Sequence, residues 1–135
     1  MKIFFDTNFI LDYFIRKEYK QISEELLAKA LEKDYEFFIS FLSLANFAYI
    51  LRKYLIEERD FYLEKTTTIF DIIPNNYSQI TEALKLKAND FEDAIQYQTA
   101  LEKQCDFIIT RNIKDFTFST LPIYTPEEFI QRYLK

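Results

Sequence analysis

The sequence predicts an α/β domain in which helices cover both faces of a parallel sheet. Short apolar runs alternate along the chain with longer segments whose apolar residues recur at helical spacing. Strands that are separated by helices in this way pair in parallel, and a parallel sheet is buried on both faces. With 135 residues, 49% of them apolar, the chain has the size of one domain, residues 1–135, with a substantial core.

Five apolar runs are expected to form the strands. They are KIFF (2–5), YEFFIS (35–40), DII (71–73), DFIIT (106–110) and PIYT (122–125). DII is the weakest of them because Pro74 stops it. The central sheet is therefore expected to have about four to five strands.

Helical segments occupy the intervals between these runs. They span residues 8–14, 20–34, 43–58, 60–70, 77–87, 90–104 and 125–134. Ser43 is a suitable N-cap for the third segment. The last segment begins with a capping box, in which Thr125 is the N-cap, Pro126 the first helical residue and Glu128 the reciprocal partner.

Missing residue types narrow the chemistry that the chain can perform. It has no Gly, which excludes glycine-rich phosphate loops, and no His, the usual general base and commonest transition-metal ligand. The single Cys105 cannot form an internal disulfide or a Cys-rich zinc site. Oxygen ligands around a hard cation remain, and Mg²⁺ or Mn²⁺ is the expected cofactor.

The formal net charge of −5 argues against a broad basic face that binds nucleic acid. It still permits a local acidic pocket with basic residues around it. Asp6 and Asp12 interrupt any apolar N-terminal stretch long enough for a signal peptide, and no stretch approaches the length of a membrane span. The expected location is the cytoplasm, without a membrane partner.

Acidic residues follow the predicted strands at the edge where parallel sheets bind their ligands. Asp6 directly follows the first strand, and Asn112 and Asp115 follow the DFIIT strand. Asp93 lies in the first turn of the helix before that strand. If these two strands are neighbours, the carboxylates meet in one pocket, where they repel one another unless a cation neutralises them.

Each of these acids also has a purely structural interpretation. Asp6 could cap the helix that follows it. Asp90 and Glu92 are expected to complement the dipole of their helix, with Asp90 as its N-cap. Asp93 precedes two buried residues, where an unpaired carboxylate would be costly, and this favours a ligand role. Two other acids are expected on the surface or in turns, Asp12 and Asp106.

Three segments together resemble the hallmark motifs of PIN domains. They are FFDTNFILD (4–12), DFEDAIQYQTA (90–100) and FIITRNIKDF (107–116). The match is closest to the branch with TRN..DF near the C-terminus, which includes VapC-like toxins, and it covers essentially the whole chain. The resemblance implies a three-layer α/β/α fold and a divalent-metal-dependent endoribonuclease that hydrolyses RNA phosphodiesters. It also implies a cognate antitoxin protein as partner, and a homodimer is possible.

The resemblance assigns Asp6, Asp93 and Asp115 as metal ligands, and adds Asn46 and Asn112 to the catalytic set. Both Asn residues stand where PIN domains usually or often carry an acid. Asn46 could ligate weakly, orient a neighbouring acid, or be an ordinary hydrogen-bonded amide of its helix. Because two neutral residues weaken cation binding, a catalytically degenerate module that binds RNA or a protein stays an alternative.

Basic residues flank the acidic segments and are predicted to bind RNA phosphates. They are Lys85, Lys87, Arg111 and Lys114. The alternative is that they are solvated surface charges. A receiver-type phosphoacceptor would also place acids around Mg²⁺, but that fold pairs two acids after its first strand. Here a single Asp6 ends that strand, which disfavours the receiver interpretation.

Overall fold

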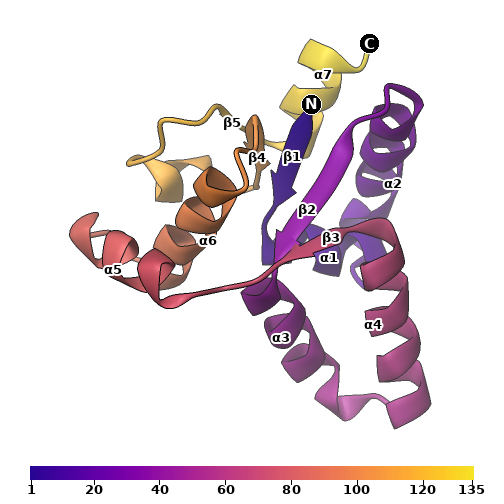
Figure 1. Ribbon diagram of the computed structural model, residues 1–135. Helices are drawn as coiled ribbons and strands as arrows, with labels where there is room; N and C mark the ends of the chain where they lie inside the picture. Colours follow the sequence, from indigo (N-terminus) through magenta and orange to yellow (C-terminus); the bar gives the residue numbers. More distant parts are fainter.

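A five-stranded parallel sheet forms the centre of the computed structural model, which describes all residues, 1–135 (Figure 1). The strands are β1 (Lys2–Phe5), β2 (Glu36–Ser40), β3 (Asp71–Ile73), β4 (Phe107–Ile109) and β5 (Ile123–Tyr124). They lie in the order β3-β2-β1-β4-β5, and every neighbouring pair is parallel. All five predicted strands are confirmed. β1 and β4 are neighbours, with Phe5 opposite Ile109, as convergence of the acids requires.

Seven α-helices fill the connections. They are α1 (Thr7–Phe14), α2 (Lys17–Glu32), α3 (Phe41–Ile50), α4 (Ile56–Ile69), α5 (Tyr77–Lys85), α6 (Phe91–Glu102) and α7 (Pro126–Tyr133). Short 3₁₀ turns occupy Leu51–Lys53 and Ile113–Phe116. No helix is long and apolar enough to cross a membrane.

The predicted helix over 43–58 with Ser43 as its N-cap is wrong at both ends. The helix begins directly after β2, where the hydroxyl of Ser40 accepts a hydrogen bond from the Ser43 amide at 3.0 Å. It ends at Ile50, and the extended backbone of Tyr54 and Leu55 separates it from α4. The apolar spacing continues across this break, so the sequence pattern does not reveal it.

Successive side chains of each strand point to opposite faces of the sheet, and this divides the core into two layers. Ile3 and Phe5 of β1 point to the face covered by α1, α2 and α7, while Phe4 points to the opposite face, against α6. Figure 1 shows α5 and α6 on one side of the sheet and α1 and α2 on the other. Phe4 and Phe5 are fully buried, and burial of each contributes about 1.5–3 kcal/mol. The predicted three-layer α/β/α architecture is confirmed.

Candidate active site

Asp6 lies at the junction of β1, α1 and β4. Its Oδ1 accepts a hydrogen bond from the Phe9 amide at 3.2 Å, which caps α1, and its Oδ2 accepts one from the Thr110 hydroxyl at 2.6 Å. Burial raises the pKa of Asp6 to about 6, and the charge of Asp12 adds to this rise, while both hydrogen bonds and the charge of Arg111 oppose it. The capping interpretation is therefore confirmed, and the cap is also a fixed carboxylate at the sheet edge.

Asp93 lies in the first turn of α6, behind its N-cap. That cap is Asp90, as predicted, and its Oδ1 accepts from the amides of Glu92 at 2.9 Å and Asp93 at 3.3 Å. The pKa of Asp93 is raised to about 7, by burial first and then by the charges of Asp90, Asp115, Asp6 and Glu92. The charges of the other two predicted metal ligands, Asp6 and Asp115, therefore both act on Asp93.

Asn112 and Asp115 occupy the loop that follows β4. The Asn112 amide donates to the Thr110 hydroxyl at 3.1 Å, and the Asp115 amide donates to the Asn112 carbonyl at 3.0 Å. These bonds fold the loop into the 3₁₀ turn Ile113–Phe116, and both side chains remain exposed. The loop therefore presents Asp115 to solvent beside the half-buried Asp93.

A polar pocket of about 180 Å³ adjoins this loop. Its lining includes Asp90, Asp115, Lys87 and Lys114, so two of the four predicted phosphate-binding residues lie beside the acids. Lys85 lies outside this pocket, on α5, where its ammonium group pairs with Glu82 at 2.7 Å. Lys87 and Lys114 thus lie beside Asp115, and Lys85 does not.

The prediction that Asp12 is a surface or turn acid is wrong, because its side chain is buried in α1. It pairs with Arg111, and its Oδ1 lies 3.5 Å from Nη1 of Arg16. The Arg111 guanidinium also lies over the ring of Tyr19, 3.3 Å from the centroid. A buried carboxylate needs such a counter-charge. An RNA phosphate would therefore compete with Asp12 for Arg111.

Asn46 makes a contact that the sequence did not reveal. Its Nδ2 donates to Oε1 of Glu92 at 2.6 Å, which joins α3 to α6. Burial raises the pKa of Glu92, the charge of Asp90 adds to this rise, and the Asn46 hydrogen bond opposes it. The position of Glu92 directly before Asp93 was the one available sequence signal, and the helix dipole offered a simpler explanation for it.

A buried polar network supports the elements that carry these residues. Gln96 of α6 accepts from the Ser40 hydroxyl at 2.6 Å and donates to the Ser43 hydroxyl at 2.7 Å. The hydroxyls of Ser43 and Thr7 are 2.8 Å apart. The network therefore joins α1, α3 and α6 and includes Thr7, the residue after Asp6, which fixes the relative positions of these helices.

The donor set fits a hard divalent cation in its chemistry. No three acidic or cysteine side chains lie close enough together to hold a metal ion by themselves. Asp6 and Asp93 are nevertheless oxygen donors whose charges repel each other, and a cation would relieve that repulsion. Mg²⁺ commonly binds through one or two carboxylates, retained waters and substrate phosphates, so these two acids are sufficient in number.

Comparison with known families identifies the class of protein that this fold and site define. A sequence model of the PIN domain family matches residues 2–114, and the chain therefore belongs to that family. No curated protein is similar enough in sequence to match.

Three solved structures, one of them a toxin–antitoxin complex, share the fold. VapBC-1 from nontypeable Haemophilus influenzae matches with a TM-score of 0.74 and 18% identity, over 94% of this chain and 99% of that chain. FitAcB from Neisseria gonorrhoeae matches with a TM-score of 0.72 and 15% identity, over 93% and 98% of the two chains. A toxin–antitoxin complex from Klebsiella pneumoniae matches with a TM-score of 0.68 and 24% identity, over 92% and 97%.

Proposed function

We propose that this chain is a divalent-metal-dependent endoribonuclease that hydrolyses RNA phosphodiesters, and that it acts in the cytoplasm as the toxin of a toxin–antitoxin pair. The observation that carries the proposal is the position of Asp6 at the carboxyl end of β1, beside β4, where its charge, like that of Asp115, acts on the half-buried Asp93. Membership of the PIN domain family supports nuclease activity, and the likeness to toxin–antitoxin complexes supports the toxin role.

Each residue of the site has a distinct part in this proposal. Asp6 and Asp93 hold the ion, and Asp115 adds negative charge from the exposed loop. A bound Mg²⁺ or Mn²⁺ would polarise the phosphoryl oxygen and lower the pKa of the attacking water. Lys87 and Lys114 bind the RNA backbone from the adjoining polar pocket, where they lie on the same side as Asp115.

The antitoxin partner is proposed to dock between α2 and α4. A groove of about 610 Å³ lies there, with apolar side chains such as Leu27, Leu31 and Ile69 in its lining. Glu24, Glu36 and Asp71 also line it. A partner segment with apolar and basic side chains would complement this groove, and the net charge of −5 would accelerate its association.

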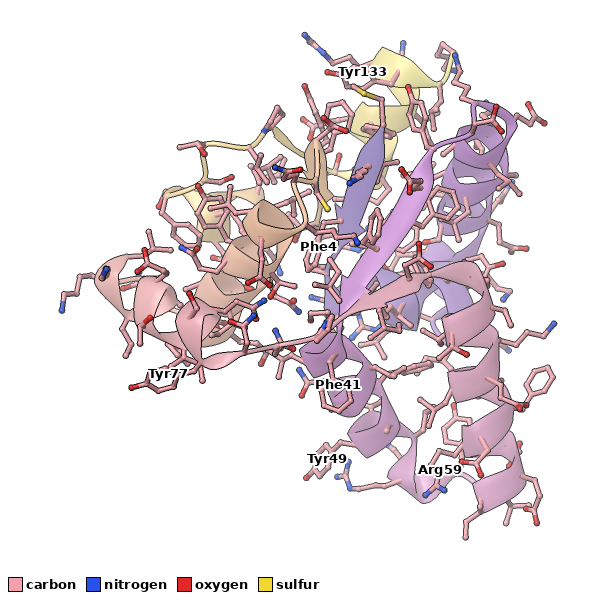
Figure 2. All side chains as sticks on the ribbon, viewed as in Figure 1. Phe4, Phe41, Tyr49, Arg59, Tyr77 and Tyr133 are labelled. Atoms are coloured by element: carbon pink, nitrogen blue, oxygen red, sulfur yellow. The ribbon has the colours of Figure 1, made fainter.

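A second copy of the chain is the proposed occupant of a further apolar groove, of about 430 Å³, between α3, α5 and α6. Phe41 and Phe91 line it and are 55% and 45% exposed, and the neighbouring Tyr77 is 77% exposed. Figure 2 labels Phe41 and Tyr77 on this part of the molecule. Light scattering at several concentrations tests the homodimer, and Phe91→Glu should shift it to monomer.

Catalytic degeneracy is the alternative that a specific observation favours. α3 carries no charged residue, so Asn46 leaves that side of the site without a carboxylate of its own. Incubation of the purified chain with a long single-stranded RNA and Mn²⁺ distinguishes the two functions. We expect metal-dependent internal cleavage, abolished by EDTA. Binding of the RNA without any cleavage, under conditions where Mn²⁺ is bound, would favour the degenerate module.

A further inference from the structure

The contact between Asn46 and Glu92 crosses from α3 to α6 at the edge of the acidic site. Asn46 Nδ2 donates to Glu92 Oε1 at 2.6 Å, a short hydrogen bond to a charged acceptor. This bond uses one carboxylate oxygen of Glu92 and leaves Oε2 available for another donor. The contact therefore fixes the direction of a long side chain that would otherwise rotate freely in the first turn of α6.

The helix dipole does not account for this contact. Asp90 already caps α6 and accepts from two of its first amides. An acid that only complements the dipole needs no partner on another helix, and fixing its rotamers costs conformational entropy. The glutamate in the first turn of α7, Glu127, is exposed like Glu92 but makes no such contact to another helix.

The negative charge of Glu92 reaches the acidic site. It contributes to raising the pKa of Asp93, although less than the charges of Asp115 and Asp6 do. α3 itself, from Phe41 to Ile50, has no charged residue to contribute. The Glu92 carboxylate is bonded to the uncharged helix α3, and Gln96, one turn further along α6, contacts Thr7, the residue directly after Asp6.

We propose that Asn46 is a positioning residue that holds Glu92 toward the α3 side of the site, where Glu92 Oε2 accepts hydrogen bonds from the water shell of the bound divalent cation. The inference rests on the proposed function, because it takes that cation as the ligand of Asp6 and Asp93. Glu92 thus supplies the charge that Asn46 cannot, and the pair together acts as one outer carboxylate of the site.

Calorimetric titration with Mn²⁺ alone tests this pair without any RNA. Glu92→Gln should bind Mn²⁺ about tenfold more weakly than the native chain. Glu127→Gln, the same chemical change in the first turn of α7, should leave the affinity unchanged. The double variant Asn46→Asp with Glu92→Gln exchanges the carboxylate and the amide of this hydrogen bond, so the negative charge now lies on α3. This double variant should recover most of the lost affinity. Melting temperatures in EDTA establish that every variant is folded.

The outcomes separate this inference from the proposed function. If the native chain binds Mn²⁺ and Asp93→Asn abolishes binding, while Glu92→Gln binds as tightly as the native chain, the inference is overturned and the proposed function stands. An equal loss in Glu92→Gln and Glu127→Gln also overturns it, because the effect would then be one of net charge. A native chain that binds no Mn²⁺ overturns the proposed function, and the inference with it.

Discussion

The hydroxyl of Thr110, at the end of β4, donates to Oδ2 of Asp6, at the end of β1, across 2.6 Å. The Asp6 amide in turn donates to the carbonyl of Ile109 at 3.3 Å. The register between the two central strands therefore fixes the position of the carboxylate. Its other oxygen is fixed by the first turn of α1, so Asp6 is held from two directions before any ligand binds.

We predict that Mn²⁺ stabilises the native chain through Asp6 and Asp93. A ligand that binds only the folded state raises the melting temperature as its concentration rises. Asp93→Asn should remove this rise, and Asp6→Asn should do the same. Asp60→Asn, on the exposed surface of α4, is the matched control and should melt like the native chain. Equal Mn²⁺-dependent shifts in the native chain and Asp93→Asn would contradict the assignment of this ligand.

Without metal, the stability of the native chain should fall as the pH rises. The folded-state pKa of Asp93 is about 7, above the value of 3.8 for the free side chain. Between these two values the folded state binds more protons than the unfolded state, so the free energy of unfolding decreases with increasing pH. Urea denaturation in EDTA from pH 4 to pH 7.5 measures this slope. Asp93→Asn should reduce the slope to the part contributed by Asp6, whose pKa is raised to about 6, and should be at least as stable as the native chain at pH 7.5.

The pair between Arg111 and Asp12 should contribute to folding rather than to RNA binding. Arg111→Met leaves the buried Asp12 carboxylate with only the more exposed Arg16 as counter-charge, which should destabilise the chain by about 3 kcal/mol. Combining it with Asp12→Asn should recover part of this loss, because no unpaired charge then remains. Urea denaturation of the native chain and three variants completes the cycle. Destabilisation that is simply additive in the double variant would argue that the two side chains act independently.

RNA binding should depend on Lys87 and Lys114 but not on Lys85. Each phosphate contact releases counterions, so Lys87→Ala and Lys114→Ala should each reduce the slope of log affinity against log salt by about 1. Lys85→Ala is the matched control, because Lys85 lies outside the polar pocket and pairs with Glu82. Fluorescence anisotropy of a labelled RNA at several salt concentrations measures the slopes. The same slope in all four proteins would place the RNA elsewhere.

Asn46→Asp should change stability in opposite directions with and without metal. Without metal it places a second carboxylate against Glu92, whose Oε1 lies 2.6 Å from Nδ2 of Asn46, and the chain should melt at a lower temperature. With Mn²⁺ the added charge should strengthen binding and reverse part of that loss. Thermal melts in EDTA and in Mn²⁺ compare the two conditions. A loss of equal size in both would identify Asn46 as an ordinary structural amide.

Local signals in the sequence predicted most of the fold. The capping box of Thr125, Pro126 and Glu128 begins α7 as expected, since each of its contacts is made within four residues. Asp90 caps α6 for the same reason. The alternation of strands and helices was sufficient to place the ends of β1 and β4 at one edge. Ser40 was missed as a cap because it also reads as the last residue of a strand.

Long-range contacts could not be predicted in the same way. The burial of Asp12 depends on Arg111, which lies 99 residues further along the chain. The hydrogen bond that Glu92 accepts comes from an amide of α3, 46 residues earlier. In both cases the residue is an acid in a helix, and its sequence neighbours carry no sign of the partner that the fold supplies.

Cleavage of a single-stranded RNA after metal add-back tests the central claim most directly. The native chain, stripped of metal with EDTA, should be inactive, and Mn²⁺ should restore internal cleavage. Asp93→Asn should cleave at least about a hundredfold more slowly than the native chain. Asp60→Asn should cleave at the native rate. Cleavage by Asp93→Asn at the native rate, or native cleavage that persists in EDTA, would contradict the account of a metal-dependent site at the ends of β1 and β4.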